Sequence, residues 1–521
     1  MMDAHFMRRM SMHGAAVAAM VLGGCGGGTS STGEASSGTA TEGPPASSTT
    51  GALPTTGSDS ISSSSSSSTG EQSTTGEAVA CGDTAAPEVP IAWDPGQPDL
   101  SGCEVRGQRD YRAIVHVHSH HSHDACDGDP QPDGVPDEDC LMDLRAALCV
   151  TRIDVAFTTD HPTHATEATI EEMLLIRGDD EPVLGAGGTA IASWMVCANG
   201  HRVLVIPGVE SGSMMPLGLE QHVPDAYGVS SPASFQQIKD VGALAWVAHT
   251  ESRDLAELAT LGLDGLELYQ LHANLDPEIR EQYLGLDPAG FLTDVSPFFF
   301  GPGPLPVPDL APLGFLLPNE PSIVALEQLG QSQRLTISAG TDAHQNVLPS
   351  KASDGERIDS YRRMIRWFNN RIRVVGPLAP ATAKAALRAG NNHIVFEAFG
   401  TPIGFDFHAR AGEAVTEMGA EVTASAGLTL VAALPRLDPR SPQSSETPGI
   451  EGRLYRATAD GRELLQSWTE GPLELVVPGP GVYRVEVWMT PRQLAPYLGE
   501  VAASYTDKPV PWIYSGAIFV R

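Results

Sequence analysis

Short apolar runs alternate with amphipathic stretches through the middle of this chain, from about residue 108 to residue 400. The apolar runs lie at residues 113–117, 153–157, 202–206, 243–248, 265–269 and 335–338. Helical periodicity occupies residues 141–149, 358–372 and 381–389. Short strands that alternate with helices are typical of a parallel sheet covered by helices, so the pattern predicts an α/β domain.

The pattern changes in the last part of the chain, residues 401–521. Short alternating strands are expected at residues 428–434, 473–477 and 483–489, separated by Gly and Pro. Such a succession predicts a small all-β, sandwich-like domain. The segment contains one histidine, His408, and no cysteine. We therefore expect a packing or recognition module there, without a second metal site.

A long insertion, residues 271–330, separates two of the predicted strands. Its middle, residues 297–318, is rich in Pro and Gly and includes three consecutive phenylalanines, 298–300. Its position between strands suggests a lid or substrate wall. A packing flap whose aromatic rings cover one face of the domain is an equal alternative.

The N-terminus has the pattern of an export signal. Arg8 and Arg9 precede a small apolar run at residues 14–22, which is too short to span a bilayer but fits a signal peptide. The run ends in Leu-Gly-Gly-Cys, which resembles a bacterial lipobox and implies a lipid anchor on Cys25. Cleavage by an ordinary signal peptidase is the alternative. We expect an exported protein anchored in the cell envelope, at the periplasmic or outer-membrane face.

Residues 26–80 are mainly Ser, Thr, Gly and Glu, with few large apolar side chains to bury, so they predict a disordered tether. The expected organisation is a signal peptide at 1–25, this tether, an α/β domain at 81–400 and the β-rich domain at 401–521.

Six cysteines follow Cys25, and an even number in an exported chain favours disulfides over free thiols. Pairing of neighbours along the chain predicts three bonds: Cys81 with Cys103, Cys126 with Cys140, and Cys149 with Cys197. None of these cysteines has the C-x-x-C spacing of a zinc or redox motif.

The segment between Cys126 and Cys140 is dense in carboxylates. Residues 127–139 could form a short calcium-binding loop, but the EF-hand spacing is absent. A solvated acidic loop closed by a disulfide is at least as good an interpretation.

The charge of the chain restricts its partners. Sixty-four acidic and 32 basic residues give a formal net charge of -32. This disfavours unassisted binding to nucleic acid or to an anionic lipid surface. An anionic substrate would need bound cations to receive it.

Histidines and carboxylates gather at the ends of the predicted strands. Residues 115–124 hold five histidines, and His116 and His118 are expected on one face of a buried strand. The carboxyl ends of parallel strands share one edge of the sheet, where active sites of β/α barrels form. We therefore expect one pocket to collect His116, His118, His161, Glu210, His249, Asp342 and His344.

Five ordered motifs, H-V-H-S-x-x-S, T-T-D-H, P-G-V-E, A-x-V-A-H and G-T-D-A-H, resemble the PHP (polymerase and histidinol phosphatase) family over about residues 108–400. The resemblance implies a distorted seven-stranded β/α barrel. It also implies two or three divalent ions, usually zinc, manganese or iron, that support phosphoester hydrolysis.

The resemblance also assigns candidate ligands. His116, His118, Glu210 and Asp342 resemble the ligands of the first metal, and Glu210 would bridge to a second. His222, with His249, would complete the second site. His161 and His344 resemble ligands of the third, together with either Asp124, which we favour, or His123.

Mixed imidazole and carboxylate ligands suit such ions, and metals that share a water lower its pKa and stabilise a phosphoryl transition state. The expected substrate is a small-molecule or oligomeric phosphomonoester or phosphodiester, with His249 or Arg253 contacting the phosphate or protonating the leaving group. Glu267 could cap a helix, hold a ligand histidine or bind metal. Alternatives are carbamate or amide hydrolysis on the same scaffold and a non-catalytic metal-binding surface protein.

Overall fold

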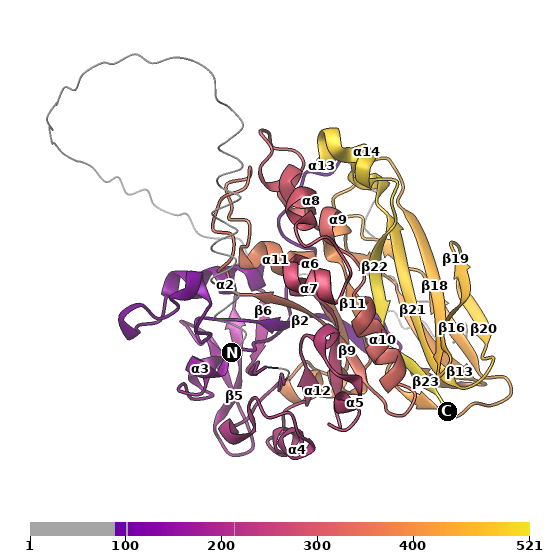
Figure 1. Ribbon diagram of the computed structural model, residues 1–521, viewed down its shortest axis with the longest axis horizontal. Helices are drawn as coiled ribbons and strands as arrows, with labels where there is room; N and C mark the ends of the chain where they lie inside the picture. The colour runs from indigo at the N-terminus through magenta and orange to yellow at the C-terminus, as the bar shows by residue number, and fades with distance from the viewer. Residues whose placement is uncertain (1–88, 101–102, 213) are drawn as a thin grey trace, which may run out of the picture. The chain divides into compact units, whose positions relative to one another are not determined.

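The computed structural model describes residues 89–100, 103–212 and 214–521. Its centre is a set of parallel strands (Figure 1). They are β2 (Gln108–Val117), β3 (Val155–Phe157), β6 (Arg202–Ile206), β7 (Trp246–Val247), β8 (Gly265–Gln270) and β9 (Thr336–Ala343). Parallel pairing runs in the order β6, β3, β2, β9, β8, β7.

Single bridges of Leu217 with Gly208 and with Leu244 connect the segment after β6 to the segment before β7. The strand expected at 243–248 is shorter than predicted. Only Trp246–Val247 forms β7, and Leu244 before it pairs through an isolated bridge. The mixed α/β architecture is confirmed, and the seven-stranded barrel stays a prediction.

Helices cover the parallel strands. In α2 (Glu138–Val150), the Asp137 side chain accepts a hydrogen bond from Cys140 N, and Leu141, Leu144 and Leu148 are buried. Such a cap satisfies one of the free N–H groups at a helix start. Further helices are α3 (Pro162–Ala165), α4 (Pro232–Asp240), α5 (Leu255–Leu258) and α12 (Pro380–Ala389). Helix α12 ends at Gly390, whose φ of 70° is the left-handed conformation typical of a glycine after a helix.

The helix predicted at 358–372 is shorter than expected. Helix α11 covers Tyr361–Trp367, and Asn369–Val375 forms strand β10. Strand β10 pairs antiparallel with β2, so Ile372 and Val374 are buried by a neighbour that is distant in sequence. Their β-branched side chains suit that strand.

The last part of the chain forms antiparallel strands. One sheet holds β14 (Ala414–Glu417), β13 (Asp406–Ala411), β16 (Thr429–Ala433) and β20 (Leu473–Val476). The other holds β19 (Gly461–Trp468), β18 (Gly449–Thr458), β21 (Gly481–Thr490), β22 (Val510–Ser515) and β23 (Ile518–Val520). Phe407 and Leu430 share an apolar core with Leu454 and Val485, so the two sheets pack together as expected of a sandwich.

Strand β11 (Asn392–Val395) joins the two parts of the chain. It pairs with β10 on one side and with β22 on the other, so hydrogen bonds cross the position expected for a domain boundary. The boundary near residue 400 stays a prediction.

The insertion forms α6 (Leu271–Leu275), α7 (Pro277–Gln282), α8 (Gly290–Phe299), α9 (Pro312–Phe315) and α10 (Glu320–Leu329). Phe298 and Phe299 are buried, and the ring centroid of Phe298 lies 5.5 Å from that of Tyr505. The backbone N–H of Val307 donates to Tyr497 O. These aromatic residues therefore act as a packing flap against the C-terminal helices α13 (Ala495–Leu498) and α14 (Ala502–Tyr505).

Two predicted disulfides are confirmed, Cys126–Cys140 and Cys149–Cys197. The predicted partner of Cys103, Cys81, lies outside the described residues, as do the signal peptide and the tether. Among the described residues, no helix has both the length and the apolar character needed to cross a membrane.

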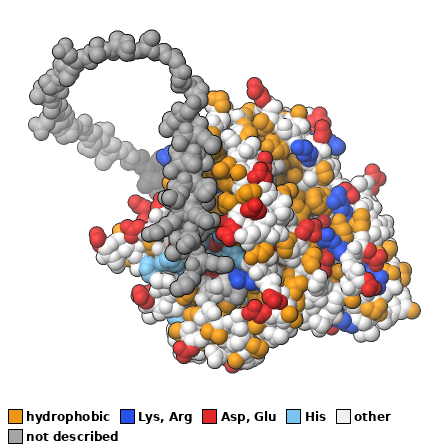
Figure 2. Space-filling model, viewed as in Figure 1, with side chains coloured by type: hydrophobic (Ala, Val, Ile, Leu, Met, Phe, Trp, Pro, Cys, Tyr) orange, Lys and Arg blue, Asp and Glu red, His pale blue; other side chains and the backbone are white. Residues whose placement is uncertain are grey.

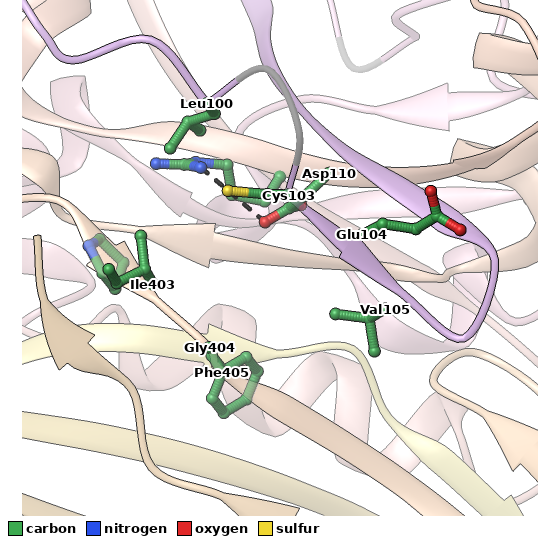
Figure 3. A pocket seen from close by; sticks show the side chains of 10 residues that line it. Leu100, Cys103, Glu104, Val105, Asp110, Ile403, Gly404 and Phe405 are labelled. Atoms are coloured by element: carbon green, nitrogen blue, oxygen red, sulfur yellow. Dashed lines mark ion pairs between the residues drawn. The ribbon is translucent and has the colours of Figure 1, made fainter. Parts of the chain in front are cut away.

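A buried ion cluster fastens β2 and β10 to the turn after β11. The carboxylate of Glu397, which is 1% exposed, accepts hydrogen bonds from Arg112 (2.6 Å), Arg371 (2.9 Å) and Thr401 (2.6 Å). Arg371 also lies 3.8 Å from Asp110, beside a cavity of about 20 Å³ (Figure 3). A second cavity, of about 190 Å³, is lined in part by Arg440. No residue of the site described below lines either cavity.

We expect Glu397→Gln to lower the free energy of unfolding by about 3–5 kcal/mol, because two buried arginines lose their counter-charge. Burial acts to raise the pKa of Glu397, but Arg112 and Arg371 hold it below its usual value. The stabilisation is therefore present above the unfolded pKa of about 4.3 and is lost as the pH falls below it.

Urea denaturation at several pH values measures this difference, which should narrow on acidification. Glu421→Gln is the control, because the exposed pair of Glu421 with Arg521 should contribute about 1 kcal/mol or less. Equal stability losses in the two variants would contradict the prediction.

Candidate metal centre

Imidazoles and carboxylates converge where the parallel strands end. His116 lies near the end of β2, and Glu210 and His249 follow β6 and β7. Asp342 is the last residue but one of strand β9, and His161 precedes α3. Parallel strands direct their carboxyl ends to one edge, which is why side chains so distant in sequence meet.

The first donor group is His116, His118, Glu210 and Asp342, whose ligand atoms lie within 4.8 Å of one another. Nε2 of His116 is 3.2 Å from Asp342 Oδ1 and 3.4 Å from Glu210 Oε2. Nε2 of His118 is 3.1 Å and 3.6 Å from the same two oxygens. The structure thus brings together the four residues expected to hold a first metal.

The backbone is distorted at this group. His116, His249 and Asp342 have positive φ angles of 72°, 51° and 51°, which non-glycine residues rarely adopt. The pairing of β2 with β9 shifts register between Val115 and Val117, where one residue of β2, His116, lies opposite two of β9, Thr341 and Asp342. Strain and bulges of this kind concentrate at functional sites, where they redirect side chains.

A second group combines His118, His161 and His344. The rings of His118 and His344 stack with centroids 3.7 Å apart. Asp124 lies beside this group, with Oδ2 3.6 Å from His161 Nε2 and Oδ1 3.5 Å from His344 Nε2. The side chain of His123 is 36% exposed and reaches Asp124 at 3.9 Å. Of the two residues considered for the third site, Asp124 and His123, it is therefore Asp124 that faces both His161 and His344.

The third group is His249, His272 and Asp342. Nε2 of His249 is 2.9 Å from Glu210 Oε1, and Nδ1 of His272 is 3.3 Å from Asp342 Oδ2. Gln270 supports this arrangement, because its Nε2 donates to Asp342 Oδ2 and its Oε1 accepts from Ala273 N at the start of α6.

His222 was expected to complete the second metal site together with His249, and the structure corrects this expectation. Nδ1 of His222 lies 3.2 Å from the Tyr227 hydroxyl, and Nε2 lies 3.0 Å from the carbonyl of Ala168. Both ring nitrogens are thus engaged away from the donor groups. The sequence pattern did not single out His272, although this residue follows the apolar run 265–269 just as Glu210 follows 202–206 and His249 follows 243–248.

Several donor atoms fit a cation better than they fit one another. His116 Nε2, His118 Nε2, His344 Nε2, Asp124 Oδ1 and Asp342 Oδ1 are buried and make no hydrogen bond. Buried polar atoms without partners are costly, and a divalent ion would satisfy these lone pairs. The residues present therefore fit a divalent metal.

The pKa shifts of His118 and Asp342 agree with their ligand forms. Burial, and then the charge of neighbouring His344, lower the pKa of His118 to about 3, so its imidazole is neutral at pH 7. Burial acts to raise the pKa of Asp342, but the neighbouring His116 holds it well below its usual range. Metals bind the neutral imidazole and the carboxylate. For His116, burial acts to lower the pKa, but the neighbouring carboxylates of Glu267, Asp342 and Glu210 raise it well above its usual value.

Arg253 and the acidic loop 127–139 were also candidate site residues, and neither belongs to the three donor groups. Arg253 is half-buried and its Nη2 donates to Gly212 O. No carboxylate of the acidic loop 127–139 joins a donor group within the described residues. Asp127 instead pairs with Arg357 at 2.8 Å, and Asp137 caps α2. This geometry favours the solvated acidic loop over the calcium site.

Comparison with solved structures gives a distant likeness. The chain is similar to the crystal structure of a two-domain protein containing a predicted PHP-like metal-dependent phosphoesterase from Bacteroides vulgatus ATCC 8482. The identity is 12%, over 82% of this chain and 99% of that chain, with a TM-score of 0.30. No family model and no curated protein matches the chain. Because this similarity is so low, the functional conclusion rests on the donor geometry.

We expect His272→Ala to lower the bound zinc by about one equivalent, because its group keeps only His249 and Asp342 as neighbouring donors. His222→Ala should keep the full complement, since both of its ring nitrogens face other partners. Elemental analysis of the purified variants after dialysis measures both. The reverse pattern would restore the original assignment of His222.

Proposed function

We propose that this protein is a metal-dependent hydrolase that cleaves phosphomonoesters or phosphodiesters at a cluster of two or three divalent ions, of zinc, manganese or iron. One observation carries the proposal: Glu210 lies at the centre of the three donor groups. Its Oε2 is 3.4 Å from both His116 Nε2 and His161 Nδ1, and its Oε1 is 2.9 Å from His249 Nε2. A carboxylate so placed can serve neighbouring ions at once.

Shared donors favour a cluster over separate sites. His118 belongs to two of the groups, and Asp342 also belongs to two. When bound, such neighbouring ions lower the pKa of a water and stabilise the charge that develops on phosphoryl oxygens. A phosphoester gains most from this arrangement, because its transition state spreads negative charge over several oxygens.

The protein's own side chains would orient the substrate and move its proton. As the alternative to serving as a donor in the third group, His249, whose Nε2 is 2.9 Å from Glu210 Oε1 and whose Nδ1 is 3.8 Å from Glu251 Oε1, is a candidate proton donor to the leaving group. Arg253 follows on the same short segment and supplies a cation for a phosphate oxygen.

The surface charge is consistent with a need for cations at the site. Acidic side chains are scattered over the face of the molecule shown in Figure 2, and the net charge is -32. A phosphoester would be repelled by such a surface over the length of electrostatic screening. Bound divalent ions would reverse the local charge and receive the substrate.

We expect turnover of a generic aryl phosphate or phosphodiester in the presence of zinc, manganese or iron. His161→Ala and His344→Ala should each lower kcat by about 100-fold or more, because each removes a donor from one side of the cluster. Steady-state kinetics with each metal tests this. His201→Ala is the control, because His201 Nε2 binds the carbonyl of Ile153 outside the donor groups.

The opposite pattern would favour the alternative reaction. Absence of phosphoester turnover with every metal, together with carbamate or amide cleavage that survives both substitutions, would point to hydrolysis that needs fewer metals.

We also propose that the protein is exported and anchored in the cell envelope through Cys25, as the Leu-Gly-Gly-Cys sequence suggests. Cys25→Ser should move the protein from the membrane fraction to the soluble fraction, as immunoblotting of fractionated cells would measure. A wild-type protein that is already soluble and without lipid would contradict this proposal.

A further inference from the structure

Glu267 lies behind the metal centre, in the middle of β8, with no exposed surface. Its Oε1 is 2.7 Å from Nδ1 of His116, and its Oε2 accepts a hydrogen bond of 2.9 Å from the backbone N–H of His249. Both carboxylate oxygens are therefore engaged by residues of the donor groups. Glu267 belongs to none of these groups itself.

The neighbouring strand is shaped to admit this carboxylate. A Cβ atom on Gly340 of β9 would lie 1.9 Å from Glu267 Oε1 and 2.9 Å from the Cβ of His116. Any larger side chain at position 340 would displace the contact. The contact with Glu267 therefore requires a glycine at the first position of the G-T-D-A-H motif.

The chemistry of the contact dictates which nitrogen of His116 carries a proton. An ionised carboxylate accepts hydrogen bonds and donates none, so Nδ1 of His116 must be the N–H partner. In the neutral imidazole that a metal binds, the lone pair is then left to Nε2, which faces Asp342 and Glu210 and makes no hydrogen bond. Because His116 is fully buried, water cannot take over the role of Glu267.

We propose that Glu267 is a positioning residue that fixes His116 in the tautomer able to bind a metal through Nε2, and holds the strained backbone at His249 in place. The inference rests on the metal cluster proposed above. It selects one of the three roles considered for Glu267, that of holding a ligand histidine. Such partners of metal-binding histidines orient the ring and tune its basicity.

Glu267→Gln tests the proposal with almost no change in shape. The backbone N–H of His249 requires the amide oxygen, so the amide NH2 is left facing Nδ1 of His116. Nδ1 must then accept, the proton moves to Nε2, and His116 cannot serve as a ligand. The reverse orientation of the amide would bring two N–H groups together at His249, at a cost of about 1–3 kcal/mol.

We expect zinc to bind the site of His116, His118, Glu210 and Asp342 about 10- to 100-fold more weakly in Glu267→Gln, with about one equivalent lost on dialysis. Zinc titration by calorimetry and elemental analysis of the full-length protein measure these quantities. Glu267→Asp keeps two acceptors and no donor, so its zinc affinity should lie between those of the wild type and Glu267→Gln.

Two further variants separate this role from a general loss of packing. Glu327→Gln also alters a buried carboxylate, which binds Arg484 at 2.9 Å outside the donor groups, and should keep all the zinc. In a double-mutant cycle, Glu267→Gln should cost no further affinity once His116 is alanine, because the two residues act through one donor.

Wild-type zinc content and affinity in Glu267→Gln would overturn the inference, as would Glu267→Asp binding more weakly than Glu267→Gln. Additive losses in the double-mutant cycle would also overturn it. The readout is metal content, so zinc binding with the expected order but no phosphoester turnover would overturn the proposed reaction and leave this inference supported.

Discussion

Lone pairs of buried imidazoles and carboxylates crowd together at one edge of the parallel sheet, and the electrostatic cost of holding them there constrains the rest of the structure. Glu210 and Asp342 are close enough to share His116 as a neighbour, yet Glu210 is buried and the side chain of Asp342 is only 10% exposed. In a medium of low dielectric, such like charges repel strongly unless cations or proton donors lie between them. A divalent ion would turn this unfavourable arrangement into a binding site.

Much of the surrounding structure serves to keep these groups in position. Asn370 of β10 clamps Ala339 of β9, with its Oδ1 accepting from the backbone N–H and its Nδ2 donating to the carbonyl. Gln270 links Asp342 to the helix that carries His272. These amides pair donors with acceptors on the strands themselves, so the edge of the sheet keeps its geometry although several residues there have strained backbones.

The insertion and the C-terminal strands are connected to this framework. Helix α6 begins the insertion and presents His272, whereas later residues of the insertion pack against helices near Tyr497 and Tyr505. Strand β22 continues the sheet through β11 to β10, which borders β2. The C-terminal part is thus hydrogen-bonded, through two strands, to the strand that carries His116.

The sequence by itself determined the alternation of strands and helices, the two disulfides now described and the set of strand ends that carry His116, Glu210, His249 and Asp342. The elements follow from local periodicity, the gathering of the strand ends from the rule that parallel strands end at one edge, and the disulfides from the pairing of cysteines that are neighbours along the chain. Only the tertiary structure shows that His272, and not His222, lies beside Asp342, that Asp124 faces His161 and His344, and that Glu267 contacts His116. Such choices depend on register shifts and on partners tens to hundreds of residues away, as with Ala168 for His222 and Gly340 for Glu267. Periodicity along one segment carries no information about either.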